Sequence, residues 1–307
     1  MGAGEGSGRL RLSITVSGLG ALYGGDLAAG LVETAQQAER AGIDQLVVTD
    51  HVAMGPRPDR YPYGPFPMPP DEPWPEPLTL LATLAGATRR IRLGTGILVA
   101  PLRPPVLLAK TLATLDVLSG GRLDCGVGVG WQPEEFEALG VPFAERWARL
   151  DEAARVCRVL WRDAPARHAG RFVAFEDLWC LPRPVQPGGP PLWLGVAATP
   201  RNLRRIAEWG DGWMPIGDDP ARLADDVGRL RETLRAAGRD PASVAVRAHA
   251  PVAADAKGRP DLDATLARLP ELAAAGVDVA AFALARFVRR RERVPAFLER
   301  LAAGAPR

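Results

Sequence analysis

The sequence predicts a (β/α)8 barrel, an α/β fold built from parallel strands and the helices that cover them. Short apolar segments and longer amphipathic segments alternate eight times along the chain, which is the rhythm of this fold. The apolar segments show too little alternation to face water on one side, as expected for strands of a covered parallel sheet. A doubly wound sheet is the alternative, but such a sheet rarely repeats the unit this many times.

The clearest part of this pattern is the stretch from 90 to 131. It contains an apolar strand at 91–99, a helix at 106–118 and a second apolar strand at 122–129. Ser119-Gly120-Gly121 ends the helix, because glycine adopts the left-handed conformation that closes a helix. A strand, a crossover helix and a parallel strand form a right-handed βαβ unit, so this stretch alone favours an α/β fold.

The other elements follow in order along the chain. Further strands are expected at 10–16, 45–49, 192–196, 211–214, 244–253 and 277–283. Further helices are expected at 26–41, 77–88, 133–140, 143–161, 200–209, 220–237, 261–275 and 294–303. Asp26 and Gly42 suit the N-cap and the C′ position of the first helix.

Two long irregular segments interrupt this order. The loop 52–76, after the second strand, is crowded with proline, glycine and aromatic residues, and a loop of this length in a compact domain usually covers or binds a ligand. The insertion 162–191 follows the fourth strand, and 171–175 within it could form a strand. We expect a flexible leader at 1–9 and a single barrel domain at 10–303.

The composition excludes several classes of function. The formal net charge is +2, so no overall field draws the protein to nucleic acid or to a membrane. The three cysteines are widely spaced and form no Cys-x-x-Cys pair, which argues against disulfides and against a metal site. No apolar run reaches the length of a membrane span. We expect a cytoplasmic protein whose partner is a small molecule.

The C-terminal ends of the strands carry the active site in a barrel of this type. His51 comes directly after the second strand, just before the long loop, and imidazole is the most common general acid or base. Asp50 beside it could orient the ring or lie further from the reacting atoms. A structural histidine bonded to a carbonyl is the alternative, and His168 and His249 suit that interpretation better.

Glycines mark the end of the fourth strand. The run 126–130 reads GVGVG, but it is a poor dinucleotide motif, since the third glycine would fall on Trp131 and no long helix follows. Gly128 and Gly130 better suit a flat ligand that lies against bare backbone.

A helix start follows the fifth strand. Thr199 suits the N-cap and Pro200 the first helical position, after the small residues Ala197 and Ala198. Free backbone N–H groups at such a terminus bind phosphate, although an ordinary capped helix is the more common outcome.

Aromatic and basic residues surround the expected site. Aromatic side chains could wall an apolar pocket or simply pack the long loop onto the barrel; they are Tyr61, Tyr63, Phe66, Trp74 and Trp131. Arg57, Arg60 and Arg103 are free to meet an acidic ligand group, but arginine is common throughout this chain.

Four motifs in the first two-thirds of the chain carry a family resemblance. They are AERAGIDQLVVTDHV (38–52), IRLGTGILVAPLRPPVLLAKTLATLDVLSGGR (91–122), GVGVGWQPEEFEALGVPFAER (126–146) and PLWLGVAATPRNLRRIAEWGDGW (191–213). They resemble the luciferase-like monooxygenase superfamily, specifically its branch of deazaflavin (coenzyme F-420)-dependent oxidoreductases. The last third matches only in its alternation of strands and helices.

The resemblance implies a flavin or deazaflavin across the strand ends. It implies a non-proline cis peptide at Gly96-Ile97 in a bulge of the third strand, pressing on the cofactor's middle ring. Asp50 and His51 match a pair that contacts the cofactor and acts as acid or base in sugar-phosphate dehydrogenase relatives. Residues matching a phosphate-holding segment are Ala197, Ala198 and Thr199. The family expectation is also a homodimer.

Trp131 departs from those dehydrogenases, which have a catalytic glutamate at this position. Sugar-phosphate oxidation is therefore doubtful, and a less polar substrate or a wall beside the cofactor ring is expected. The first hypothesis is hydride transfer between F-420 and a carbonyl-bearing or unsaturated substrate, with His51 moving the proton. The second is a monooxygenase that uses FMN reduced by a partner reductase. The third is a barrel that binds flavin without catalysis.

Overall fold

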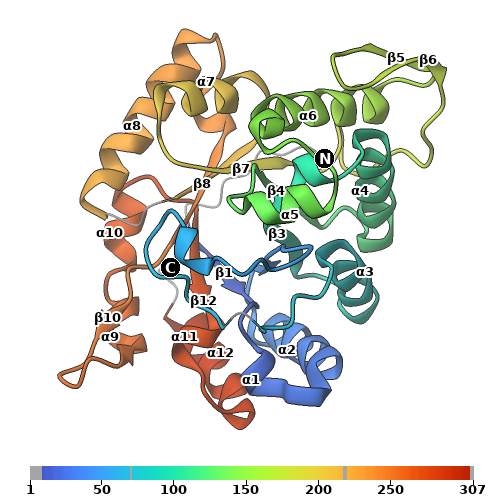
Figure 1. Ribbon diagram of the computed structural model, residues 1–307. Coiled ribbons are helices and arrows are strands. Elements are labelled where there is room, and N and C mark those ends of the chain that lie inside the picture. The colour runs from blue at the N-terminus through green and yellow to red at the C-terminus, as the bar shows by residue number, and fades with distance from the viewer. Residues whose placement is uncertain (1–8, 70, 217–219, 305–307) are drawn as a thin grey trace.

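Eight parallel strands form a closed barrel at the centre of the chain (Figure 1). The computed structural model describes residues 9–69, 71–216 and 220–304, so all but one residue of the expected leader lies outside the described residues. Around the barrel the strands follow the order β1-β12-β9-β8-β7-β4-β3-β2, and every neighbouring pair is parallel. Their bounds are β1 Arg11–Thr15, β2 Gln45–Val48, β3 Arg92–Val99, β4 Leu123–Gly128, β7 Leu192–Val196, β8 Gly212–Pro215, β9 Ala245–His249 and β12 Val279–Ala283. The predicted fold class is confirmed.

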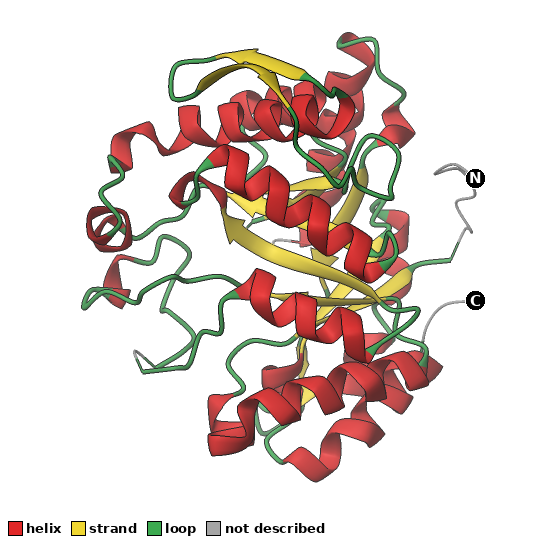
Figure 2. Cartoon of the chain, turned by 90° about the vertical axis from the view of Figure 1, so that its right-hand side faces the viewer, coloured by secondary structure: helices red, strands yellow, loops and turns green. Residues whose placement is uncertain are grey.

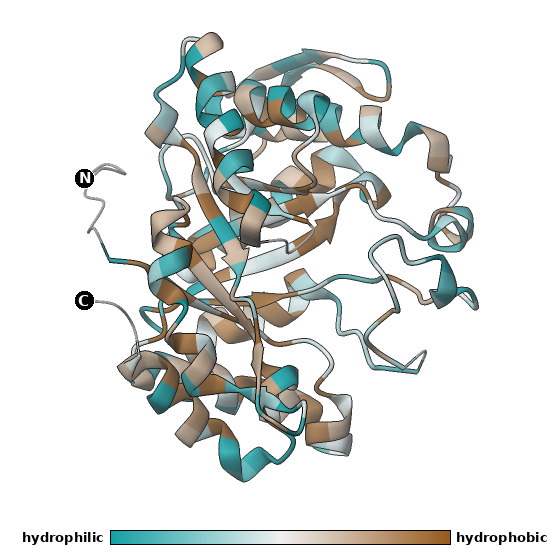
Figure 3. Cartoon of the chain, turned by 90° about the vertical axis from the view of Figure 1, so that its left-hand side faces the viewer, coloured by the Kyte–Doolittle hydropathy of each residue, from teal (hydrophilic) through white to brown (hydrophobic). Residues whose placement is uncertain are grey.

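Helices surround the strands on the outside of the barrel (Figure 2). The long ones are α2 Leu27–Ala41, α3 Pro77–Ala87, α4 Pro105–Ser119, α6 Arg146–Arg162, α7 Pro200–Trp209, α8 Pro220–Ala236 and α12 Val294–Ala303. Their inward faces and the outward faces of the strands share one core, in which Leu12, Leu46 and Leu93 are fully buried. The apolar strands and the polar outer faces of the helices are visible in Figure 3. None of the helices in the described ranges is long and apolar enough to cross a membrane.

Short elements complete the described chain. They are the helices α1 Gly20–Tyr23, α5 Pro133–Ala138, α9 Leu262–Leu266, α10 Leu269–Ala274 and α11 Leu284–Phe287, and the strands β5 Ala166–Ala169, β6 Ala174–Leu178, β10 Ala253–Ala254 and β11 Pro260–Asp261. Gly42 ends α2 in the left-handed conformation as predicted. Asp26 stands at the N-cap of α2 but makes no capping bond, because its carboxylate pairs with Arg291 instead.

Three predicted elements need correction. The segment 171–175, expected as a strand, contains the turn between β5 and β6 and the start of β6, because the Glu152 carboxylate accepts from the N–H groups of residues 171–173. The expected helix 261–275 is two helices, α9 and α10, since Pro270 at the start of α10 has no N–H for a continuous helix. The expected strand 244–253 stops at His249, and Ala253 pairs with Asp261 in a separate short hairpin.

A layer of polar side chains fills part of the barrel interior. The prediction that the strands are apolar segments did not foresee this layer. Arg247, only 4% exposed, donates from Nε to Ser13 Oγ and Gln45 Oε1, both at 3.1 Å, and from a terminal nitrogen to Thr15 Oγ1 at 2.9 Å. Gln45 in turn donates to Asp124 at 2.7 Å. Burial lowers the pKa of Arg247 to about 10, against a smaller opposing effect of Asp124.

Candidate active site

The end of β3 carries an irregularity at the barrel mouth. The register with β4 shifts between Thr95 and Leu98, and the Gly96-Ile97 peptide bond within this bulge is cis, as the resemblance implied. A Cβ on Gly96 would lie 2.5 Å from Val47 Cγ1, so only glycine fits there without a shift of neighbouring atoms. The bulge turns the half-buried Ile97 side chain toward the ends of β4 and β7.

The glycines at these strand ends have a packing role that the sequence interpretation did not foresee. A Cβ on Gly128 would lie 2.1 Å from Ile97 Cδ1, and one on Gly195 would lie 2.2 Å from Ile97 Cγ2. Gly130 has a positive φ of 72°, and its Cβ would meet the side chains of Val99 and Phe136. The space beside Gly128 is therefore filled by Ile97, rather than left as bare backbone for a flat ligand.

Asp50 lies at the end of β2 and holds the next strand rather than the neighbouring histidine. Its carboxylate accepts from Val99 N at 2.8 Å and from two terminal nitrogens of Arg103 at 2.6 and 3.1 Å. Burial alone would lower the pKa of Arg103, but its hydrogen bonds to Asp50 and Glu76 outweigh burial and raise it. Of the two roles considered for Asp50, a place further from the reacting atoms fits, because its oxygens face the β3–α4 connection and not the ring of His51.

His51 instead faces a carboxylate from α5. Its Nδ1 lies 3.3 Å from Glu135 Oε2, and the side chains are 9% and 0% exposed. The other oxygen of Glu135 accepts from Val52 N at 2.5 Å and Ala53 N at 3.3 Å. Sequence reasoning missed Glu135, since a glutamate in a short helix that also contains Glu134 and Glu137 gives no signal by itself.

The segment from 132 to 135 fastens the start of the long loop. Gln132 is fully buried; its Oε1 accepts from Gly55 N at 2.5 Å and its Nε2 donates to Ala53 O at 3.0 Å. Glu134 accepts from Arg60 at 2.8 Å. The end of β4 and the loop after β2 therefore form one surface, although about eighty residues separate them in the chain.

Aromatic rings from the loop after β2, together with Trp131 after β4, surround His51. Their contacts with one another fit the alternative in which they pack the loop onto the barrel, and the wall of an apolar pocket stays a prediction. The ring centroid of His51 lies 4.8 Å from Trp74, 5.8 Å from Trp131 and 6.1 Å from Phe66, each in an edge contact. Tyr61 contacts both Phe66 and Trp131 at 5.2 Å, so the rings also contact one another. We call this group the aromatic cage; its members are Tyr61, Phe66, Trp74 and Trp131. Tyr63 contacts Tyr61 at 5.3 Å on its outer, exposed side.

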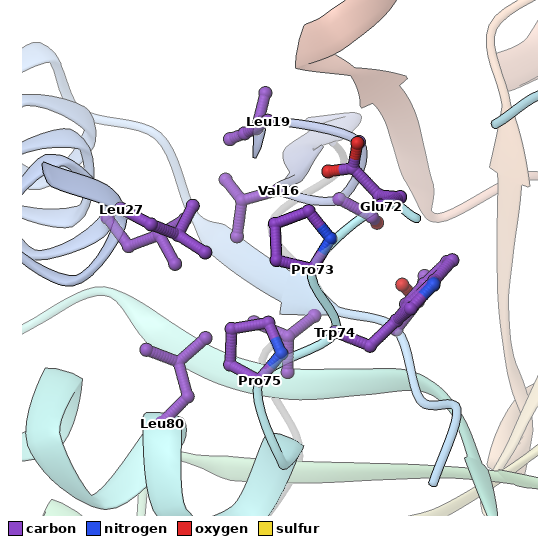
Figure 4. Close-up of a pocket in the computed structure, with 13 residues that line it drawn as sticks. Val16, Leu19, Leu27, Glu72, Pro73, Trp74, Pro75 and Leu80 are labelled. Carbon is purple, nitrogen blue, oxygen red and sulfur yellow. The ribbon is translucent and has the colours of Figure 1, made fainter. Parts of the chain in front are cut away.

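The last part of the loop is anchored beside the cage. In Figure 4, Pro73 and Pro75 point toward the side where Leu27 and Leu80 lie, whereas Trp74 points the opposite way. These prolines line a cavity of about 20 Å³ at the ends of β1 and β2, room for about one water molecule. Two anchored prolines on either side of Trp74 fix the direction of its indole, which is also the direction of His51.

Polar atoms without partners border this cavity. Ser17 Oγ, Thr49 Oγ1 and Trp74 Nε1 are buried and have no hydrogen-bond partner within the described ranges. Buried polar groups in native proteins are nearly always bonded, so these three groups require a partner, which either one water molecule in this cavity or the polar edge of a larger ligand would supply. A flavin or a deazaflavin has such an edge, and the residues at the mouth therefore fit either cofactor.

The helix start after β7 offers fewer donors than predicted. Thr199 is the N-cap of α7 and its Oγ1 accepts from Asn202 N at 3.3 Å, while Thr199 N donates to Ala197 O at 2.8 Å. Pro200 has no N–H, so Arg201 supplies the remaining first-turn donor. The side chains of Ala197 and Ala198 are half-buried and leave room beside this donor.

None of the three candidate arginines is free. Arg57 pairs with Asp59 at 2.6 Å, Arg60 with Glu134, and Arg103 with both Asp50 and Glu76. The prediction that they are available to an acidic ligand is wrong, because each guanidinium already has a carboxylate partner. Apart from the Glu135 carboxylate, the side chains around His51 are aromatic, and these arginines bring no uncommitted charge to it.

The geometry is that of a barrel with one enclosed histidine at its mouth, and a family model matches nearly the whole of it. The model described as luciferase-like monooxygenase matches residues 12–296. The chain belongs to the luciferase-like monooxygenase family. Proteins similar to it include F420-dependent enzymes and a flavin-dependent monooxygenase.

Three relatives show the range of the family. An uncharacterized protein of Mycobacterium tuberculosis is 38% identical over 230 residues, which covers 74% of this chain and 75% of that protein. The monooxygenase RslO1 from Streptomyces bottropensis superposes with a TM-score of 0.78 at 22% identity, covering 96% of this chain and 98% of that one. An F420-dependent secondary alcohol dehydrogenase, solved with an F420-acetone adduct, superposes with a TM-score of 0.76 at 16% identity, covering 97% and 100%.

Proposed function

We propose that this chain transfers a hydride between coenzyme F-420 and a small, uncharged substrate that carries a carbonyl or a hydroxyl group. The observation that carries the proposal is the enclosure of His51, a group able to move a proton, inside an apolar aromatic cage. Reduction of a carbonyl needs one hydride and one proton. The similarity to an F420-dependent secondary alcohol dehydrogenase supports the same substrate class.

The cage argues for an uncharged substrate. Arg57, Arg60 and Arg103 are each paired with a carboxylate, so a substrate carboxylate or phosphate would have to share a guanidinium whose charge is already balanced. Trp131 supplies an aromatic face in the cage, and an apolar substrate would replace water there without loss of hydrogen bonds.

The cofactor supplies or accepts the hydride when it is bound. The chain contributes the rest. Ile97 and the bulge of β3 give an apolar surface at the centre of the mouth, and the polar edge groups Ser17, Thr49 and Trp74 lie toward β1 and β2. The proposed phosphate position is the helix start after β7, where Arg201 supplies the N–H donor and the small side chains of Ala197 and Ala198 before Thr199 leave room beside it.

His51 holds the proton that accompanies the hydride. As the carbonyl carbon gains the hydride, the carbonyl oxygen takes the proton from the protonated imidazole, which becomes neutral; in the reverse direction the neutral ring takes the hydroxyl proton. Asp50 lies outside this step. It holds Val99 and Arg103, and so fixes the β3–α4 connection that follows the bulge.

A second candidate is a monooxygenase that receives reduced FMN from a reductase. The similarity to the monooxygenase RslO1, with its TM-score of 0.78, favours this candidate. In that case the aromatic cage would exclude water from the reacting cofactor, and His51 would act on the substrate or the oxygen-derived group.

The test is turnover under anaerobic conditions with reduced F-420 and a set of neutral ketones, followed by the return of deazaflavin absorbance. His51→Asn should lower the turnover rate about 10²- to 10⁴-fold, the usual contribution of a proton donor, while deazaflavin binding is retained. His168→Asn, in the remote β5–β6 hairpin, serves as the matched control. Full activity of His51→Asn on a ketone that the unmodified protein reduces would exclude this role.

A further inference from the structure

Glu135 is a buried carboxylate with an unusual set of partners. The residue is 1% exposed, and in the described part of the chain its only ion-pair partner is the ring of His51. Oε1 accepts from the backbone N–H groups of Val52 and Ala53, and Oε2 lies 3.3 Å from His51 Nδ1. All of these contacts concern the three residues that follow Asp50.

The carboxylate determines where the proton of His51 resides. An ionised carboxylate only accepts hydrogen bonds, so the ring nitrogen that faces it must carry hydrogen. In the neutral ring, a proton on Nδ1 leaves Nε2 bare, and Nε2 is the atom on the far side of the ring from Glu135. Edge contacts with Trp74 and Trp131 hold the ring plane itself.

We propose that Glu135 is a positioning residue that fixes His51 with its proton on Nδ1, and so makes Nε2 the atom that exchanges a proton with the substrate. This inference rests on the proposed function of His51. In ketone reduction, Nε2 gives its proton to the carbonyl oxygen while Nδ1–H stays bonded to Glu135; in alcohol oxidation, Nε2 receives the hydroxyl proton. The buried negative charge balances the ring whenever both nitrogens carry protons.

A purely structural role for Glu135 would be to hold the start of the loop. Gln132 provides the comparison, because it bonds Gly55 N and Ala53 O but makes no contact with His51. The two buried side chains therefore separate loop attachment from ring orientation, and variants at the two positions distinguish the roles.

The variant Glu135→Gln should change which nitrogen of the His51 ring carries the proton, while keeping the hydrogen bonds to the start of the loop. The glutamine oxygen can still accept from Val52 N and Ala53 N, but its NH₂ group then faces His51 Nδ1. Two donors cannot face each other, so the ring should move its proton to Nε2 and accept on Nδ1. Gln132→Ala should weaken the attachment of the loop and leave the proton of His51 on Nδ1.

The experiment uses full-length protein labelled with ¹⁵N-histidine, at a pH where the ring is neutral, with the His51 signals assigned from the His51→Asn spectrum. Nitrogen chemical shifts distinguish a protonated from a bare ring nitrogen. The unmodified protein and Gln132→Ala should show a proton on Nδ1, and Glu135→Gln a proton on Nε2. Turnover of Glu135→Gln should fall about 10²- to 10⁴-fold in kcat with little change in KM, as expected when a proton-transfer group is misoriented.

A proton on Nε2 in the unmodified protein would overturn the proposal, whether or not the variant folds. An unchanged tautomer in Glu135→Gln would also overturn it. If the tautomer reverses but kcat does not fall, Glu135 does position the ring, and the proton-transfer role of His51 is then the part that fails.

Discussion

At the residue scale, two histidines at the ends of different barrel strands have opposite surroundings. His51 faces a carboxylate, whereas His249 at the end of β9 faces Arg247 and Arg286. Burial, followed by the charges of these two arginines, lowers the pKa of His249 to about 3. His249 is therefore neutral in the folded protein at every pH near neutrality, while its counterpart in the unfolded chain titrates near 6.5.

This difference predicts a loss of stability on acidification. Between pH 6.5 and 3 the unfolded chain binds a proton at His249 and the folded chain does not, so the free energy of unfolding decreases as the pH falls through this range. By pH 5 the loss should be about 1–2 kcal/mol. Urea unfolding of the unmodified protein and of His249→Asn at pH 7.5 and pH 5 measures it, and equal losses in the two proteins would contradict the prediction.

At the element scale, the side chain of Ile97 in the β3 bulge packs against glycines of two other strands. Ile97 fills the spaces that Gly128 of β4 and Gly195 of β7 leave, so the bulge and the two glycines depend on one another. The aromatic cage also depends on two elements that are distant in the chain. It combines a loop after β2 with a turn after β4, and Gln132 and Glu135 connect them.

This packing of Ile97 predicts that two glycine-to-alanine substitutions lower the free energy of unfolding by unequal amounts. Gly128→Ala contacts the end of the Ile97 side chain, which rotation about χ2 can move, whereas Gly195→Ala contacts Cγ2, which is fixed by the branched Cβ. We expect Gly195→Ala to lower the free energy of unfolding by about 1–3 kcal/mol, and Gly128→Ala to lower it by less. Chemical unfolding measures both, and Ile97→Ala should relieve part of the cost of Gly195→Ala. Equal costs, or no relief, would show that Ile97 does not set the packing.

The order of elements could be predicted because each strand is apolar and each helix has its own end signals. The position of His51 followed from the same reasoning, since the active site of such a barrel lies at the C-terminal ends of its strands. The partner of His51 could not be predicted, because Glu135 is distant in sequence and reaches the ring only through the closed barrel. The strand expected at 171–175 was wrong for a similar reason. The Glu152 side chain, which is distant in sequence, accepts hydrogen bonds from the N–H groups of residues 171–173, so these residues form a turn.

At the scale of the whole molecule, the barrel combines an apolar outer core with a polar inner layer and a mouth that is closed by a loop. The net charge of +2 gives no general attraction for charged partners, so recognition depends on the mouth itself. The homodimer stays a prediction; Leu107 and Leu118 on α4 and Trp179 after β6 are the exposed apolar side chains that could serve it. The expected cytoplasmic location also stays a prediction.

The choice of cofactor is tested most directly by titrating the purified protein with F-420 and with FMN, each oxidised and reduced, and following fluorescence. The account predicts micromolar binding of F-420 and binding of FMN weaker by about tenfold or more, a difference of about 1.4 kcal/mol. Tighter binding of FMN would contradict hydride transfer with F-420 and assign the protein to the monooxygenases that depend on a reductase. Binding of neither would contradict the assignment of the barrel mouth as a flavin site.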